Sequence, residues 1–525
     1  MLAGAALVAF AVACGGGGGS SSGGGGGGVI IVPTSTPTPT PSPTPASGSG
    51  LPASQSACTF NSASAQNVAV AVPSAMVRRA IAQAPAGPRY VPGVLEVMHA
   101  GNEGLTIEHV EPGTEDAAVT TLRGKPGVTG VARAIYRHLE TASVYAPNDQ
   151  YWSHAGTGAP PFYQTDAQGG QWDMHLICVA RAWGYSQAAG NTFGVAPGVL
   201  ADNVKIAIID TGVDTTHPDL AGKVVYQATY VGGFQGNTVH DNNGHGTNVA
   251  GIAAGATNNA FGFVGAGFNA QIMAYRVFAD PAPGCTGTAC ETSASTADID
   301  LAINDAVARG AKVISLSLGS APSGTCATDP GEAPERTVIA NAVNAGVVVV
   351  AAAGNESNPK LDCPGGDAGV IAVGASNLTD TGIGTAVTGE HIASYSNYDA
   401  TSPNAWGVTA PGGDPSGSSD ADFYHWIEGM WTSTAADGSS TTACAADIFG
   451  ESGNCRILIA GTSQATPHVS GIVALMLGAH PGLAPALVGQ YLCSTALNIG
   501  DSKQGCGRVD AYRAVARALG DATVP

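Results

Sequence analysis

The chain has few charged side chains, and basic ones are the scarcest. Only 11% of its 525 residues are charged, and 20 Lys and Arg against 39 Asp and Glu leave a net charge of −19. Because binding to a phosphate backbone needs clustered Lys and Arg, this balance argues against nucleic acid as a partner. The acidic surplus is compatible with a bound structural cation such as calcium, which prefers oxygen ligands, but it assigns no ligand to one.

The sequence also lacks the cysteine and histidine spacings of a zinc site. None of the 11 cysteines forms a CxxC pair, and no paired-histidine pattern accompanies them. Setting Cys14 aside leaves ten, an even number that suits disulfides in an exported chain. Closeness in sequence suggests four pairs and elimination leaves a fifth: Cys285–Cys290, Cys326–Cys363, Cys444–Cys455, Cys493–Cys506 and Cys58–Cys178.

The apolar run at the N-terminus is too short to cross a bilayer. Residues 1–14 end in Ala-Val-Ala-Cys before a Gly/Ser run, which resembles the cleavage site of a bacterial lipoprotein with Cys14 as the lipidated residue. A plain signal peptide and chance remain as alternatives, because no Lys or Arg precedes the run. Residues 15–50, first Gly/Ser-rich and then alternating Thr and Pro, predict a linker that would hold a domain away from a surface; disorder with no tethering role is the alternative.

Two folded regions are expected after the linker. Residues 51–146 predict a small α+β unit without a candidate site, with a helix at 74–84, a strand at 89–97 and an apolar segment at 128–139. Residues 147–525 alternate apolar strands at 204–209, 271–277, 312–316, 347–352 and 370–374 with helices at 245–254, 297–309, 335–345 and 463–477. Fully apolar strands between helices indicate the α/β class, a parallel sheet covered on both faces, whose sites lie beyond the carboxyl ends of the strands.

Four polar side chains stand where catalysis would need them. Ser463 lies among small residues at the start of an apolar helix, so a substrate can approach and backbone N–H groups face developing negative charge. His245 lies between two glycines, which suits a base that meets its substrate closely. Asp210 ends one buried strand and can orient a histidine ring, and Asn355 follows another and can donate to an oxyanion. Each of them alone also fits an ordinary turn or helix start.

Taken together and in this order, the four motifs resemble the subtilase family, the subtilisin-like serine peptidases. The matching stretches are Asp210-Thr211-Gly212, His245-Gly246-Thr247, Ala353-Gly354-Asn355 and Gly461-Thr462-Ser463. The order Asp, His, Ser is also that of subtilisin. The resemblance covers roughly residues 147–518 and implies a three-layer parallel-sheet catalytic domain that hydrolyses peptide bonds and needs no cofactor for the chemistry.

The resemblance also implies roles for single residues. Ser463 is the nucleophile, His245 the general base and Asp210 its orienting acid, while Asn355 and the Ser463 N–H form the oxyanion hole. The residues implied in substrate binding are Ser317, Leu318, Gly319, Ala352, Ala353 and Gly354, whose small pocket walls favour an apolar or bulky side chain over a charged one. Residues 51–146 resemble a propeptide that inhibits the enzyme until it is cleaved within 140–148.

Two other functions fit part of the pattern. Asp-Thr-Gly also occurs at Asp380, and two such carboxylates sharing a proton would make an aspartic protease. Asp380, however, follows a polar segment, and this reading leaves His245 and Ser463 unexplained. A tethered binding protein on a subtilase scaffold is the non-enzymatic alternative, disfavoured because all four catalytic positions are filled. We therefore expect an exported peptidase, lipid-anchored at the cell envelope or secreted, that acts on peptides or proteins.

Overall fold

The computed structural model describes residues 10–12, 27–30, 90–99, 105–135, 147, 149, 151–152, 171–188, 201–281, 293–379, 389–403, 406–414, 426–444 and 455–520. The chain divides into two compact units, one made of Met1–Phe60 with Ser143–Pro525 and the other of Asn61–Ala142. Cys14, the predicted lipidation site, lies outside the described residues. Within the described ranges, no helix is both long and apolar enough to cross a membrane.

The larger unit is built on a nine-stranded sheet that is mostly parallel. Its strands are β6 (Lys205–Asp210), β7 (Val224–Val231), β8 (Phe234–Gly236), β9 (Gln271–Arg276), β10 (Val313–Leu316), β11 (Val348–Ala352), β12 (Val370–Thr379), β13 (Gly389–Ile392) and β14 (Gly407–Pro411). They follow the order β13-β12-β11-β10-β6-β9-β7-β8, and β14 pairs with β12. Only the β12–β13 and β7–β8 pairs are antiparallel. The predicted α/β class with a parallel sheet is confirmed.

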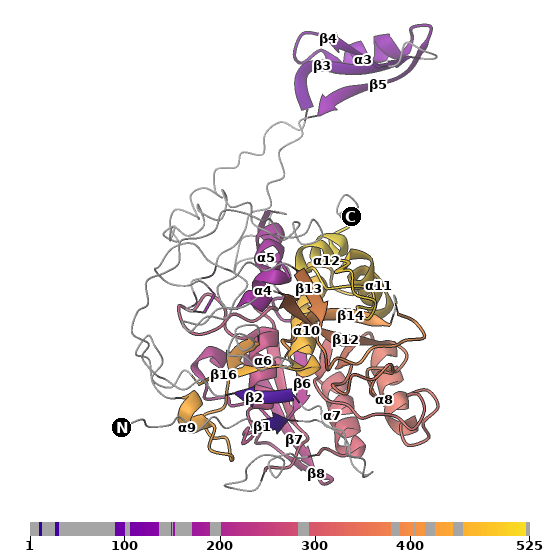
Figure 1. Ribbon diagram of the computed structural model, residues 1–525. Coiled ribbons are helices and arrows are strands. Elements are labelled where there is room, and N and C mark those ends of the chain that lie inside the picture. Colours follow the sequence, from indigo (N-terminus) through magenta and orange to yellow (C-terminus); the bar gives the residue numbers. More distant parts are fainter. Residues whose placement is uncertain are drawn as a thin grey trace. The chain divides into compact units, whose positions relative to one another are not determined.

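Both faces of this sheet are buried, because successive side chains of a strand point to opposite sides. In β6, Ile206 and Ile208 join one apolar cluster, whereas Ala207 and Ile209 join another. Helices of the first cluster are α4 (Trp172–Leu176), α5 (Val179–Ala188), α6 (His245–Ala254), α10 (Thr462–Ala479), α11 (Pro485–Thr495) and α12 (Ala511–Ala518); those of the second are α7 (Thr296–Ala308) and α8 (Ala333–Asn344) (Figure 1). The result is the expected three-layer arrangement.

Helix α10 passes through the core of this unit. Every residue from Thr462 to Gly478 is buried, as expected for a helix that is apolar on all sides. The helix approaches α6 closely, since a Cβ built on Gly471 would lie 2.7 Å from the carbonyl oxygen of Ala253. His468 is held inside the core, where its Nε2 lies 2.7 Å from Oδ2 of Asp173. His468 is therefore a structural residue of the core.

A smaller antiparallel sheet leads into α10. Strand β16 (Arg456–Ile459) pairs with β15 (Ile427–Met430) and with β2 (Gly27–Ile30), and β2 pairs with β1 (Phe10–Val12). The other described elements of this unit are the short helix α9 (Ser440–Ala443) and the 3-10 helix η2 (Pro218–Leu220). Because β16 ends just before Gly461, this sheet determines where α10 begins.

The second unit is a small α+β structure. Strand β3 (Tyr90–His99) lies between β4 (Leu105–His109) and β5 (Val128–Ile135), and helix α3 (Glu115–Arg123) packs on the sheet. Its core includes Leu95, Val97, Leu122 and Val131. The predicted strand at 89–97 corresponds to β3, and the helix predicted at 74–84 lies outside the described residues. The role of this unit as a propeptide stays a prediction.

Three of the predicted disulfides are present in the larger unit. They are Cys326–Cys363, Cys444–Cys455 and Cys493–Cys506. Cys178 is also disulfide-bonded. Cys58, Cys285 and Cys290, named in the other two predicted pairs, lie outside the described residues.

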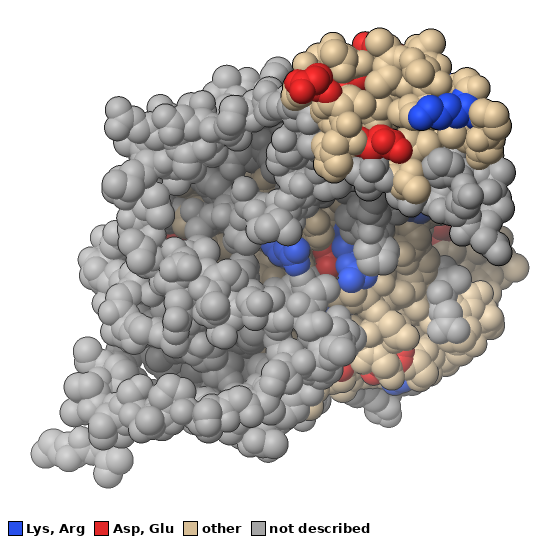
Figure 2. Space-filling view, turned by 90° about the horizontal axis from the view of Figure 1, so that it is seen from above, with Lys and Arg blue, Asp and Glu red and all other residues tan. Residues whose placement is uncertain are grey.

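Charged side chains are sparse on the surface, but an arginine and a glutamate form a fully buried ion pair. Figure 2 shows few Lys, Arg, Asp and Glu side chains among the described residues of one face. Inside the larger unit, Arg508 Nε donates to Oε2 of Glu390 at 2.9 Å, and neither side chain is exposed. Arg508 Nη1 also donates to the Leu176 carbonyl at 2.6 Å. This pair links β13 to the segment that precedes α12.

Candidate active site

Asp210 and His245 are brought together at the carboxyl edge of the sheet. Asp210 is the last residue of β6 and is fully buried, and His245 is the first residue of α6 and is 3% exposed. His245 Nδ1 donates to Oδ1 of Asp210 at 2.7 Å. Because an ionised carboxylate can only accept, the proton belongs on Nδ1 and the lone pair on Nε2. The ring is thus held in the tautomer that a general base requires.

Nearby charges favour the protonated form of His245. Burial by itself disfavours the imidazolium, but the charge of Asp210, the hydrogen bond to it and the charge of Asp241 together raise the pKa of His245. Asp241 is fully buried and anchors the loop before α6, since it accepts from Thr211 Oγ1 at 3.0 Å and from Thr247 N at 2.9 Å. The site is therefore arranged to stabilise a histidine that takes up a proton.

The glycines that flank His245 serve packing between chain segments. Gly244 has a φ of +110°, and a Cβ there would collide with the Trp431 ring. A Cβ on Gly246 would collide with the carbonyl oxygen of Gly212 and lie 3.1 Å from Oδ1 of Asp210. The sequence suggested that these glycines let a substrate approach. Instead, each glycine lets another part of the chain pack closely beside the histidine.

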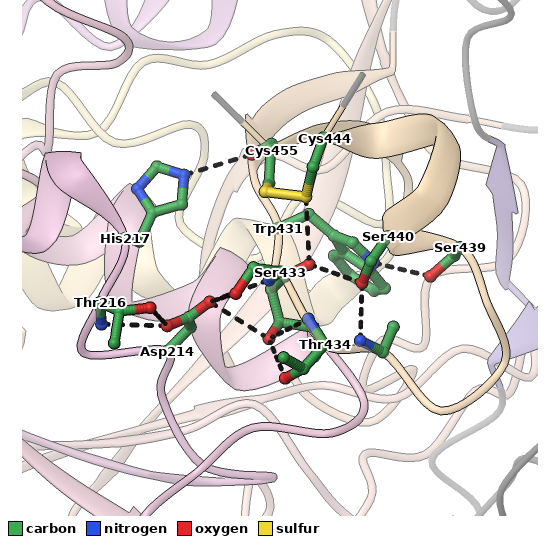
Figure 3. The surroundings of a disulfide bond; sticks show 12 residues. Asp214, Thr216, His217, Trp431, Ser433, Thr434, Ser439, Ser440, Cys444 and Cys455 are labelled. Atoms are coloured by element: carbon green, nitrogen blue, oxygen red, sulfur yellow. Dashed lines mark hydrogen bonds between the residues drawn. A yellow bond between two sulfur atoms is a disulfide. The ribbon is translucent and has the colours of Figure 1, made fainter. Parts of the chain in front are cut away.

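The segment that contains Trp431 is braced beside the site. Figure 3 shows Asp214 between Thr216 and Ser433, with the Cys444–Cys455 disulfide on the far side of Ser433. Ser433 donates to Oδ2 of Asp214 through its backbone N at 2.8 Å and its hydroxyl at 2.6 Å. Burial alone would raise the pKa of Asp214, but hydrogen bonds from Ser433 and Thr216 lower it to about 2. Asp214 therefore stays ionised and ties the segment after β6 to the segment that carries Trp431.

Ser463 lies in the first turn of α10 and is tied to the end of β10. Its hydroxyl donates to the Ser317 carbonyl at 3.1 Å, and the Ser317 hydroxyl donates to the Ser463 carbonyl at 2.8 Å. Gln464 Nε2 donates to Oδ1 of Asn248 at 3.2 Å, which joins this turn to the first turn of α6. The proposed nucleophile thus lies beside the helix that carries His245, while its hydroxyl hydrogen is directed to Ser317.

Asn355 follows β11 and is oriented by the residue that precedes Ser463. Its Oδ1 accepts from Thr462 N at 2.9 Å and from Thr462 Oγ1 at 2.8 Å. Because Oδ1 accepts both hydrogen bonds from Thr462, the Nδ2 hydrogens point away from Thr462 and can serve as donors. Gly354 has a φ of +107°, and a Cβ there would collide with Asn397 Nδ2. The turn that presents Asn355 therefore requires glycine.

The residues predicted to bind substrate lie on adjacent segments. Strands β10 and β11 are parallel neighbours, with Leu316 opposite Ala351. Residues 362–363 bond to the chain at both strand ends: Asp362 N donates to the Ala353 carbonyl at 2.9 Å, and Cys363 exchanges two backbone hydrogen bonds of 2.9 Å with Ser320, the residue after 317–319. The predicted set is therefore brought to one edge of the sheet.

Comparison with known proteins identifies the family. The model of the subtilase family matches residues 201–514, more than half of the chain. The chain belongs to the subtilase family. It is 32% identical over 374 residues to thermitase from Thermoactinomyces vulgaris, covering 71% of this chain and 99% of thermitase. It is 34% identical to subtilisin DY from Bacillus licheniformis, over 58% of this chain and 88% of that protein.

A solved structure supports the same fold. Fervidolysin from Fervidobacterium pennivorans, described as a keratinolytic enzyme related to subtilisin, aligns with 82% of this chain and 61% of its own, at 21% identity and a TM-score of 0.50. The family match and the similarity to thermitase and subtilisin DY identify the protein as a subtilisin-like serine endopeptidase that acts on peptide substrates. The aspartic-protease alternative is thereby set aside, and Asp380 itself lies outside the described residues.

Two residues that help to build the subtilase site were not singled out from the sequence. Thr462 orients Asn355, and Asp241 connects the loop before His245 to Thr211. Both belong to the family motifs or lie next to them, so the motif spacing could have drawn attention to them. Their specific contacts depend on which loops meet in the folded chain, which the spacing does not show.

Asp149 and Asp219 are two buried carboxylates, and the charge of Asp149 acts on Asp219. Asp149 accepts from Asn258 N at 2.7 Å, and Asp219 accepts from Asn259 Nδ2 at 2.8 Å. Burial raises the pKa of Asp149 to about 7, and burial together with the charge of Asp149 raises that of Asp219 to about 8. In the described part of the chain, no group of three or more His, Cys, Asp and Glu side chains could hold a metal ion. The pair would supply two of the roughly six to eight oxygens that calcium takes.

Proposed function

We propose that the enzyme cleaves peptide bonds with Ser463 as nucleophile, His245 as general base and Asp210 as the acid that orients the base. The observation that carries this proposal is the buried 2.7 Å hydrogen bond from His245 Nδ1 to Asp210. It leaves Nε2 free to take the serine proton and later to give it to the leaving amine. The raised pKa of His245 supports the imidazolium that forms between these two steps.

In the structure, the serine hydroxyl is hydrogen-bonded to a backbone carbonyl and not to the base. It donates to the carbonyl of Ser317, the first residue of the segment expected to pair with the substrate. A peptide that binds along 317–319 as an added strand approaches this carbonyl. We expect a rotation of the Ser463 side chain to exchange the carbonyl for His245 Nε2 as acceptor, since catalytic hydrogen bonds often form only in the substrate complex.

The oxyanion is bound by the Nδ2 of Asn355 and the backbone N–H of Ser463. The two hydrogen bonds from Thr462 that fix the Asn355 amide support this role. The position of Ser463 in the first turn of α10 leaves its N–H without an intrahelical acceptor. Both donors are fixed before the reaction begins, so little reorganisation accompanies the development of charge.

The proposal also covers how the enzyme is made and held. The chain would be exported, with Cys14 as a lipid anchor, and residues 51–146 would inhibit the peptidase until self-cleavage within 140–148. Asp149 and Asp219 would hold a structural calcium ion, which would neutralise their charges and has no part in the chemistry. These features rest on the sequence motifs and on the buried carboxylate pair.

A fluorophosphonate probe, which reacts with activated serines, tests the catalytic proposal. We expect labelling of the purified protein and none of the Ser463→Ala variant. The precursor of that variant should also persist at full length. Absence of serine-dependent labelling would overturn the assignment of Ser463, and unchanged processing in the variant would overturn self-cleavage.

A further inference from the structure

An acidic side chain lies between the two segments assigned to the primary specificity pocket. A Cβ built on Gly319 would lie 3.1 Å from Cβ of Asp362, and one built on Gly354 would lie 2.7 Å from its Cγ and 2.9 Å from its Oδ2. Asp362 thus occupies space that side chains on either wall would fill. The sequence pointed to small, uncharged walls because Asp362 lies outside both wall segments.

The backbone holds Asp362 firmly in this position. Its own N–H donates to the Ala353 carbonyl on one wall, and its neighbour Cys363 exchanges two backbone hydrogen bonds with Ser320, which follows the other wall. Cys363 is also joined to Cys326 by a disulfide. The carboxylate therefore stands on a rigid support, as a specificity residue must.

The carboxylate has a charge that its surroundings do not neutralise. Asp362 is 3% exposed, its Oδ1 accepts from Asn397 Nδ2 at 3.1 Å, and no described residue donates a hydrogen bond to its Oδ2. Burial, with the negative charge of Glu356, raises the pKa of Asp362 to about 7. Within the described ranges, no Lys or Arg forms an ion pair with Asp362 or Glu356. A buried carboxylate of this kind gains most from a cation brought by a ligand.

We propose that Asp362 selects substrates with Lys or Arg at the residue before the scissile bond. This inference rests on the proposed function, because it takes 317–319 and 352–354 as the walls of the primary specificity pocket. The basic side chain would extend between Gly319 and Gly354 and pair with Oδ2 of Asp362. Glu356, whose Oε2 accepts from Asn355 N at 2.9 Å, adds negative charge close by. Acidic side chains at the same substrate position are rejected by both carboxylates.

The test uses the mature full-length enzyme and fluorogenic peptides that differ only at this position, with Arg, Lys, Phe, Ala or Glu. We expect kcat/KM for Arg and Lys to exceed that for Phe by about tenfold or more. Asp362→Asn should lower kcat/KM for Arg and Lys at least about 30-fold, as for loss of one partner of a buried charge pair. Its kcat/KM for Phe should stay within about threefold of the wild-type value.

Two further variants separate charge from folding. Asp362→Glu keeps the charge and should retain the preference for basic residues. Asp399→Asn removes a half-buried carboxylate that accepts hydrogen bonds only from Thr401 among the described residues, and it should not change the preference. A wild-type preference for Phe or Ala would overturn the proposal. So would equal loss of Arg cleavage in Asp362→Asn and Asp362→Glu while both react normally with the fluorophosphonate. If the wild-type enzyme does not react with the fluorophosphonate, the proposed function fails, whatever the role of Asp362.

Discussion

The orientation of Asn355 by Thr462 leads to a quantitative prediction about catalysis. Thr462→Val preserves the shape of the side chain but removes the 2.8 Å hydrogen bond from Oγ1 to Oδ1 of Asn355, and leaves the 2.9 Å bond from the backbone N. One buried neutral hydrogen bond contributes about 0.5–1.5 kcal/mol. If that energy is lost from positioning the oxyanion donor, kcat should fall about two- to twelvefold.

The effect should be specific to the transition state. Because Thr462 points to the amide and not to the bound peptide, KM should change little and the loss should appear in kcat. Asn355→Ala should lower kcat much further; the loss of ~100–1,000-fold known for such a donor was measured in subtilisin, a member of this family. Steady-state kinetics on one peptide substrate give kcat and KM for the wild-type enzyme, Thr462→Val and Asn355→Ala.

Thr466→Val is the matched control. Thr466 is also buried in α10 and donates to the Thr462 carbonyl at 2.8 Å, but no hydrogen bond links it to Asn355. Its kcat should stay close to that of the wild-type enzyme. Equal losses of kcat in the two valine variants, or an unchanged kcat in Thr462→Val, would refute the reasoning that Thr462 positions the oxyanion donor.

Three predictions concern stability. Glu390→Gln should lower the free energy of unfolding in guanidinium by about 3–5 kcal/mol, because it leaves Arg508 charged, buried and unpaired; the double variant Glu390→Gln with Arg508→Met should recover part of this. Asp149 and Asp219 have folded-state pKa values of about 7 and 8, above the unfolded value, so their contribution to stability is full below about pH 4 and is lost as pH rises through 7 and 8. Without calcium, the Tm should therefore fall as pH rises from about 4 to about 8, and added calcium should offset the loss; a Tm that does not respond to pH in this range contradicts the assignment. Gly471→Ala should lower the free energy of unfolding by about 1–3 kcal/mol through overpacking against α6, and wild-type stability would show that α6 can move aside.

The sequence predicts the central sheet well because its strands are buried on both sides. β6, β9, β10 and β11 are mainly apolar, and their predicted bounds differ from the observed ones by at most one residue at either end; β12 extends five residues beyond its predicted end into a more polar stretch. Strand β7 is not predicted from the sequence. Its residues alternate between more exposed and less exposed positions, as at a sheet edge, so it is not an apolar run. Strand β13, with Glu and His in four residues, is recognisable only through its pairing with β12.

The site is predictable as a set of motifs but not as a set of contacts. Asp210 and His245 could be paired in advance because each stands at the end of an element with a family motif. The hydrogen bond between Ser463 and Ser317 spans 146 residues and depends on how β10 meets α10. Asp362 could not be placed in the pocket from the sequence, because the loop that carries it reaches the two walls only in the folded chain.

The buried helix α10 has a consequence for the cell that makes this enzyme. Proteins are synthesised from the N-terminus, so Asp210, His245 and Asn355 emerge before α10, which carries Ser463 and fills the centre of the core. A nascent chain that ends before this helix has neither its reactive hydroxyl nor the side chains that cover one face of its sheet. On the proposed chemistry, the chain can therefore cleave proteins only after α10 has been synthesised. A translation product that stops before this helix cannot cleave the proteins around it.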